Sequence, residues 1–121
     1  MNLTHAYLLA SRPLSTMAFS GVVSNQSVYL NGSGGQAGNG FPLPRRGYIT
    51  ALQVWDGTTL RFENEQLQFQ AGDRIAVYCQ AAGSDFAVKI RLNGNSTALQ
   101  VTGVPFNSTL YATVELMLIR E

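Results

Sequence analysis

The segment 32–37, "GSGGQA", has residue types and spacing that could bind a phosphate. It fits the G-x-G-x-x-G/A pattern of a dinucleotide-binding loop and follows a predicted strand at 27–30. Such a loop needs a helix that begins at the glycines, because the helix N-terminal amides hold the pyrophosphate. The next residues, "GNGFPLP", include two prolines, through which a helix cannot continue. The sequence therefore predicts a Gly-rich surface loop at 31–40, with no nucleotide and no other cofactor.

Arg45 and Arg46 follow this loop and could bind a phosphate or a nucleic-acid backbone. The net charge is only +1, from eight basic and seven acidic residues, which is a weak electrostatic footprint for nucleic acid. The alternative is that the two arginines pair with acidic groups of a neighbouring protein. We expect this second role, and no nucleic-acid partner.

Catalytic and metal-binding residues are sparse. His5 is the only histidine and Cys79 the only cysteine, and they are far apart in the sequence. Cys79 alternates with Ile75 and Val77, which predicts a small core residue rather than a nucleophile. No cluster has the ligand types and spacing of a zinc or calcium site. We therefore expect no enzyme, no catalytic residue and no metal.

"VWDG" (54–57) places the only tryptophan beside an acidic residue. An exposed Trp55 could stack on a sugar ring while Asp56 accepts hydrogen bonds from its hydroxyl groups. The alternative is that Trp55 packs under a loop or in a subunit interface. Both interpretations stay open at this point.

The elements that must position these residues have the period of strands. From Tyr48 onward, apolar and polar residues alternate between turn signals eight to twelve positions apart. "TTLRFE" (58–63) and "QLQFQ" (66–70) read as two strands joined at "ENEQ", with Leu67 and Phe69 inward. Asn93-Gly94 is the strongest hairpin signal, because both residue types tolerate positive φ. The sequence predicts an all-β, two-sheet antiparallel β-sandwich of about eight strands.

The chain is long enough for one domain, and its charges are unevenly placed. Residues 1–44 contain Arg12 as their only charged residue. We therefore expect an N-terminal arm or edge segment at 1–20 and a single sandwich domain at 21–121. "AYLLA" (6–10) is too short for a signal peptide, and no window has the length of a membrane span. We expect a soluble protein with no leader and no membrane partner.

The closing segment, "TLYATVELMLI" (109–119), is apolar on both alternating faces. A strand of this kind is covered on both sides. The second cover is either another subunit, with Tyr111, Met117 and Ile119 at the contact, or residues 1–20 folded back.

Three stretches carry a resemblance to a known family. They are "FPLPRRGYITALQVWDG", "FQAGDRIAVYC" and "TLYATVELMLIRE". Together the stretch from Phe41 to Glu121 resembles trimeric jelly rolls of the tumour-necrosis-factor/C1q type from bacteria and their viruses. The resemblance implies a compact sandwich that trimerises around an axis lined by apolar and aromatic side chains. Family members serve as ligands, fibre heads, sugar-binding heads and capsid decoration proteins.

These observations lead to one hypothesis and one alternative. The hypothesis is a non-enzymatic assembly protein, a homotrimer that decorates or cements a phage capsid at the virion surface. The alternative is a carbohydrate- or receptor-binding head that uses Trp55 and Asp56. In the first case, the residues expected to dock onto a larger protein assembly, such as a major capsid protein, are Leu3, Tyr7, Leu8, Leu9, Arg12, Met17, Phe19, Arg45 and Arg46.

Overall fold

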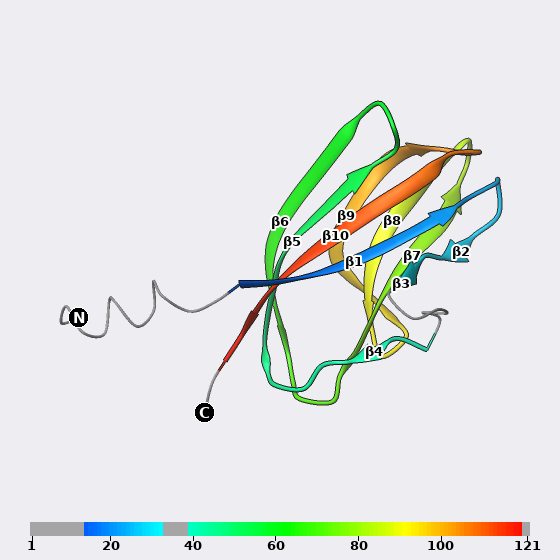
Figure 1. The fold of residues 1–121 in the computed structure, drawn as a ribbon. Coiled ribbons are helices and arrows are strands. Elements are labelled where there is room, and N and C mark those ends of the chain that lie inside the picture. Colours follow the sequence, from blue (N-terminus) through cyan, green and yellow to red (C-terminus); the bar gives the residue numbers. More distant parts are fainter. Residues whose placement is uncertain (1–13, 33–38, 120–121) are drawn as a thin grey trace.

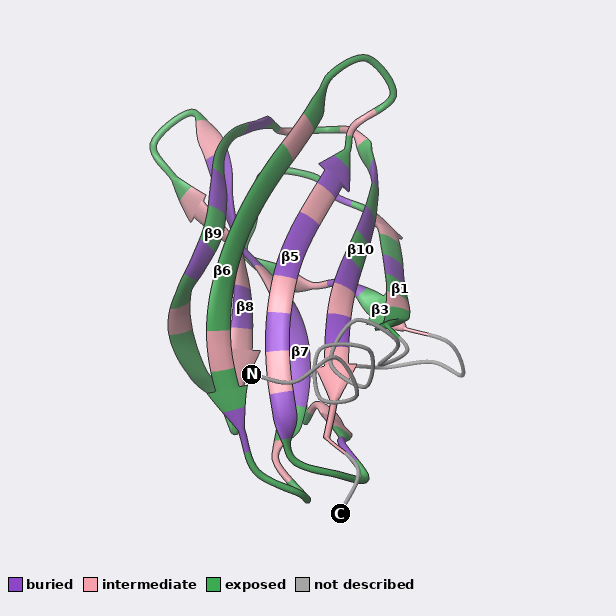
Figure 2. Cartoon of the chain, turned by 90° about the vertical axis from the view of Figure 1, so that its left-hand side faces the viewer, coloured by how far each residue is buried: buried purple, intermediate pink, exposed green. Residues whose placement is uncertain are grey.

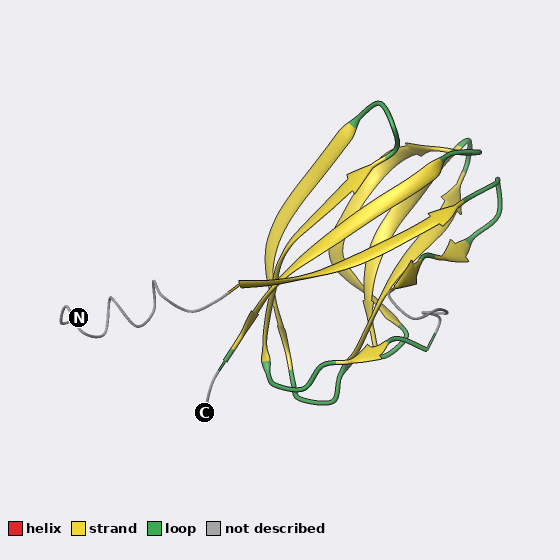
Figure 3. Ribbon diagram, viewed as in Figure 1, coloured by secondary structure: helices red, strands yellow, loops and turns green. Residues whose placement is uncertain are grey.

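The computed structural model describes residues 14–32 and 39–119, and all regular structure in these residues is β-strand (Figure 3). The described residues form ten strands: β1 (Leu14–Val22), β2 (Val28–Tyr29), β3 (Asn31–Gly32), β4 (Phe41–Pro42), β5 (Gly47–Trp55), β6 (Leu60–Phe69), β7 (Arg74–Ala82), β8 (Asp85–Leu92), β9 (Asn95–Pro105) and β10 (Thr109–Leu118). Three of these strands have only two residues each, and they raise the total above the expected eight. β2 lies within the strand predicted at 27–30. β3 corrects the predicted loop at 31–40, because the first two residues of that loop pair with β1.

The strands form two antiparallel sheets, which confirms the predicted β-sandwich (Figure 1). Sheet A has the order β3-β1-β10-β5-β6, and sheet B has the order β2-β7-β8-β9, with β4 also paired to β7. The first and last long strands, β1 and β10, pair along nine residues from Leu14↔Met117 to Val22↔Thr109. The sequence alone predicts no strand order, because this pairing joins residues about a hundred positions apart.

The core lies between the two sheets and takes alternate side chains from both. Its largest fully buried members include Phe69, Phe86, Ile49 and Leu110. Full burial of a side chain of this size contributes about 1.5–3 kcal/mol each, so the interior is the main source of stability. Cys79 is fully buried in this core, as its spacing predicts.

The beginning of the chain corrects one boundary. Residues 14–20, which the sequence assigns to an arm or edge segment, belong to β1 and are paired within sheet A. Phe19 is 2% exposed in the core, and Met17 packs against the core from the same face of the strand. β1 lies near the edge of sheet A, since only the two-residue β3 follows it in the strand order. The sandwich therefore begins before residue 21 and includes these residues as a strand rather than as an arm.

The hairpin at Asn93-Gly94 is confirmed. Both residues have positive φ, 54° for Asn93 and 82° for Gly94, and they connect β8 to β9. Two central residues with positive φ match the right-handed twist of the paired strands.

The hairpin predicted at "ENEQ" is wrong, because β6 is one continuous strand across it. Opposite β5, Ile49 pairs with Leu67 but Ala51 pairs with Asn64, so two residues of β6 stand against Thr50 alone. Along β6 itself the alternation is unbroken, so Leu67 and Phe69, at odd positions, point inward, whereas Leu60 and Phe62, at even positions, point outward. The change of face lies in β5, where Ile49 points inward but Ala51, two residues on, pairs with the outward-facing Glu115.

Candidate protein interface on the outer face of sheet A

The outer face of sheet A carries a row of large apolar side chains across three strands. Trp55 of β5 lies directly opposite Leu60 of β6 on one side and Tyr111 of β10 on the other. Directly paired residues share a face of the sheet, with Cβ atoms about 5 Å apart. The exposed fractions are 39% for Trp55, 55% for Leu60 and 53% for Tyr111. The three side chains therefore form one continuous exposed surface.

A second row runs beside the first. Phe62, which is 56% exposed, faces outward opposite Gln53, and Thr113 and Ala18 continue this row onto β10 and β1. Figure 2 views the molecule from this side, with β6, β5, β10 and β1 in order. We call the four largest exposed side chains of these rows the apolar face: Trp55, Leu60, Phe62 and Tyr111.

Charge is nearly absent around the apolar face. Among the described residues that point outward from sheet A, the carboxylates are Glu115 and, at the edge bulge, Glu65, and there is no cation. Thr50 donates a hydrogen bond from Oγ1 to Glu115 Oε1 at 2.8 Å, which ties this carboxylate to the neighbouring strand. Depletion of charge around large aromatic side chains is the compositional signal of an interface core.

The outer face of sheet B has the opposite character. Arg91 and Lys89 point outward from β8, where they pair with Ala76 and Tyr78 of β7. The Arg91 guanidinium lies 3.9 Å from the ring centroid of Tyr78 and donates a hydrogen bond to Tyr29 Oη at 2.7 Å. Its cation is satisfied within its own sheet, and the face is suited to water. The outer face of sheet A is thus apolar and nearly uncharged, whereas the outer face of sheet B is charged.

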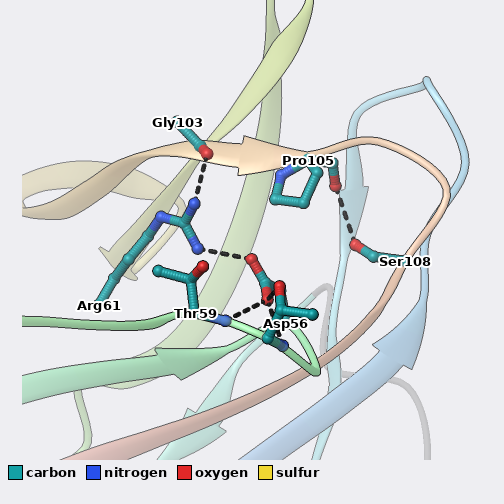
Figure 4. A network of polar contacts seen from close by, with 7 residues as sticks. Asp56, Thr59, Arg61, Gly103, Pro105 and Ser108 are labelled. Carbon is teal, nitrogen blue, oxygen red and sulfur yellow. Dashed lines mark hydrogen bonds and ion pairs between the residues drawn. The ribbon is translucent and has the colours of Figure 1, made fainter.

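Asp56, the acid beside Trp55, holds the turn between β5 and β6 (Figure 4). Oδ1 accepts hydrogen bonds from the backbone N–H groups of Thr58 and Thr59, each at 2.8 Å, and Oδ2 accepts one from Arg61 at 2.7 Å. Arg61 also donates to the carbonyl of Gly103 at 2.7 Å, which links the two sheets. The hydrogen bond from Thr59, then that from Arg61, lowers the pKa of Asp56 well below its ordinary value.

The Trp55–Asp56 pair is therefore divided between two roles. The Asp56 side chain is 2% exposed, and both of its oxygen atoms accept hydrogen bonds within the protein. Trp55 stays accessible and belongs to the apolar face.

The three residues expected at a trimer contact are not brought together. Tyr111 lies in the apolar face, and Met117 points outward from the same strand near its other end, beside Leu14 and Tyr48. Ile119 follows the end of β10, where its N–H donates to the Arg46 carbonyl at 2.9 Å. The sequence pattern does not place Trp55, Leu60 and Phe62 beside Tyr111. The odd spacing of five positions between Phe62 and Leu67 is the signal that could have shown it, because residues at an odd spacing in one strand point to opposite faces.

The residues expected to dock onto a partner do not lie together either. Leu3, Tyr7, Leu8, Leu9 and Arg12 lie outside the described residues. Phe19 is buried in the core, so its assignment to an exposed docking surface is corrected, whereas Met17 packs against the core and stays partly exposed. Arg45 and Arg46 lie in the exposed loop before β5, beside Ile119.

Residues 14–32 and 39–119 contain no helix long and apolar enough to cross a bilayer. Within the same residues, no group of three or more His, Cys, Asp or Glu side chains is placed to hold a metal ion. Comparison of the chain with models of protein families, with curated proteins and with solved structures finds no match.

Proposed function

We propose that this protein is a non-enzymatic assembly protein: a small β-sandwich that forms a homotrimer through the outer face of sheet A. The trimer decorates or cements a larger particle such as a phage capsid. The observation that carries the proposal is the row of Leu60, Trp55 and Tyr111 across three paired strands, with Phe62 beside it.

The exposed apolar area of these side chains favours association. Four large side chains that are each about 40–55% exposed lose contact with water when a second sheet covers them. Burial stabilises by about 25 cal/mol per Å² of apolar surface, and aromatic anchors dominate the energy of most interfaces. A contiguous patch of this kind on a soluble domain marks an interaction site.

Self-association fits the distribution of polarity over the two sheets. In a closed oligomer, each copy presents the same patch toward a common axis. Packing sheet A inward leaves the Arg91 and Lys89 side of sheet B in water. The loop that carries Arg45 then stays available to contact acidic groups of the particle. The number of copies, three, comes from the resemblance to trimeric jelly rolls.

Trp55 provides a direct test, because it is the only tryptophan and lies in the apolar face. We expect the purified protein to sediment as a trimer at micromolar concentration. On dilution it should dissociate, with a red shift of the Trp55 emission as the indole becomes hydrated. Phe62→Asp should give monomers at all of these concentrations and show the red-shifted emission throughout.

Gln100→Asp is the matched control, since Gln100 is an exposed strand residue that faces outward from sheet B opposite Lys89. It should sediment like the wild type. A wild-type protein that remains monomeric at micromolar concentration, with emission unchanged by dilution, would contradict the self-association. Co-sedimentation with the particle, lost in Arg45→Glu and kept in Gln100→Asp, would separately test the decoration step.

The alternative of a carbohydrate-binding head keeps one observation in its favour, the accessible indole of Trp55. A sugar that stacks on Trp55 would change the emission without changing the sedimentation coefficient. Loss of that response in Trp55→Ala, together with an unchanged oligomer, would favour the alternative.

A further inference from the structure

The free edge of β1 is a second surface suited to a partner. β1 pairs with β10 along its whole length, but on its other edge it pairs with β3 only at Phe19 and Ser20 (Figure 1). No described strand covers this edge from Leu14 to Ala18. The unpaired N–H and C=O groups of such an edge are a template for an additional strand.

An apolar hollow lies beside this free edge. It has a volume of about 310 Å³ and lies between β1, β3 and β4. Its described lining residues are Thr16, Met17, Ala18, Phe19, Gly32 and Phe41. The rings of Phe19 and Phe41 lie 6.1 Å apart at its inner side, and no charged residue is among those named. The hollow therefore fits apolar side chains of a strand that pairs with β1.

The segment between β3 and β4 does not have the composition to fill this hollow. Residues 33–38 read "SGGQAG", so the methyl group of Ala37 is their only apolar side chain. A hollow of this size and lining needs larger apolar groups to exclude water.

The N-terminal segment of the chain has matching chemistry. Residues 6–10 read "AYLLA", which is apolar at every position and carries no charge. Thirteen residues precede β1 and can span roughly 40 Å when extended. We propose that residues 6–10 of a second copy add as a strand to the free edge of β1 and place alternate side chains in the hollow.

The junction before β1 indicates why the strand comes from a second copy. Folding back onto the chain's own β1 would need a tight hairpin at Ser11-Arg12-Pro13. That tripeptide lacks the Gly, Asn or Asp that such turns require, and proline fixes its φ near −65°. The junction therefore favours a segment that leads away from its own sheet and reaches a neighbour.

This inference rests on the proposed self-association, since it requires a second copy close by. It uses a different surface, however, because the edge of β1 is separate from the apolar face. Exchange of N-terminal strands would connect the copies even where the sheet faces alone bind weakly.

The test uses full-length chains with one added cysteine each. Thr16→Cys protein, carrying a mass tag, is mixed with either Tyr7→Cys or Leu8→Cys protein under mild oxidation. Adjacent residues of a strand point to opposite faces, so only one of the two can meet the thiol introduced at position 16 at disulfide distance. We expect the Thr16→Cys protein to form at least tenfold more disulfide-linked heterodimer with one of the two proteins, Tyr7→Cys or Leu8→Cys, than with the other. Native Cys79 is fully buried, and unmodified protein is the control for its contribution.

Three outcomes would overturn the inference. Equal cross-linking of Tyr7→Cys and Leu8→Cys would indicate random collisions of the segment. A Tyr7→Cys/Thr16→Cys or Leu8→Cys/Thr16→Cys double variant that forms only an internal disulfide would show that the segment pairs with its own chain. Absence of any heterodimer in a protein that sediments as a trimer would remove the strand exchange and leave the proposed function standing. A monomeric wild-type protein would instead remove the proposed function itself.

Discussion

At the scale of single residues, the polar chemistry of this chain holds turns in place. Asp56 fastens the β5–β6 turn through Thr58, Thr59 and Arg61. Asp73 does the same before β7, where its carboxylate accepts hydrogen bonds from Gln70 N–H and from the Asn93 amide. These hydrogen bonds, first from Gln70 and then from Asn93, lower the pKa of Asp73. Both carboxylates thus stabilise the fold in their ionised form.

The first prediction concerns pH. Because the folded-state pKa of Asp56 lies below its ordinary value of 3.8, the unfolded chain binds the proton more tightly than the folded one. The stabilisation is fully present above about pH 5 and is lost progressively as the pH falls below that value. Asp56→Asn should lower the melting temperature at pH 7. It should also make the melting temperature fall less between pH 5 and pH 2, as measured by circular dichroism. Glu65→Gln, at an exposed position of β6, is the control; the prediction fails if the two variants behave alike.

The second prediction concerns Gly47, which pairs with Leu118 where β5 and β10 approach closely. A Cβ atom at this position would collide with the backbone carbonyl of Met117, which cannot rotate away. Gly47→Ala should lower the free energy of unfolding by about 1–3 kcal/mol or more, measured by urea denaturation. At Gly21 the nearest atom to an added Cβ would be the end of the Leu30 side chain, at 3.3 Å. Gly21→Ala should therefore cost less, and the reverse order would contradict this account.

At the scale of elements, an irregularity in β5 sets the faces of the candidate interface. Leu67 and Phe69 pack inward at one end of β6, and Leu60 and Phe62 are exposed at the other. Phe62 and Leu67 are five positions apart, so regular alternation along β6 puts the two pairs on opposite faces. In β5, by contrast, the inward positions change from Ile49 to Leu52 and Val54, and this change puts Trp55 on the outer face beside Leu60.

The third prediction is that deletion of Gln66 destabilises the protein far more than substitution of it. The deletion either turns Phe69 and Leu67 toward water or forces Arg61 out of its contacts with Asp56 and Gly103. Loss of the two buried side chains alone corresponds to about 3–6 kcal/mol. Gln66→Ala keeps the strand length and should change stability by less than about 0.5 kcal/mol. Chemical denaturation of both variants measures this, and a deletion variant as stable as the wild type would contradict the assigned register.

At the scale of the whole molecule, the sandwich has one apolar outer face and one charged outer face. The core between the sheets is closed, so the apolar face is not needed for folding. This is why we propose that another chain covers its exposed aromatic residues.

The fourth prediction follows from the sparse charge of the apolar face. Exposed ion pairs weaken when the screening length falls from about 10 Å at 0.1 M salt to about 3 Å at 1 M. Burial of apolar surface does not depend on this length. The association constant of the oligomer, measured by analytical ultracentrifugation, should stay within a few-fold between these salt concentrations. A decrease of several orders of magnitude would indicate that charged residues drive the association.

The sequence by itself determines the fold class of this protein and its strongest turn, but not the absence of a turn at "ENEQ". Alternation of apolar and polar residues predicts strands because neighbouring side chains of a strand point to opposite faces. Asn93-Gly94 determines its hairpin for an equally local reason. The core position of Cys79 follows from its spacing to Ile75 and Val77.

Only the tertiary structure decides which of these strands are neighbours and which faces meet water. The pairing of β1 with β10 makes Phe19 a core residue, although its flanks suggest an arm. The irregularity of β5 at Thr50 turns Trp55 outward, and the registers of β6 and β10 then place it between Leu60 and Tyr111. These positions depend on contacts between distant segments, whose energies no local window of sequence contains. The candidate interface is for that reason a property of the folded molecule.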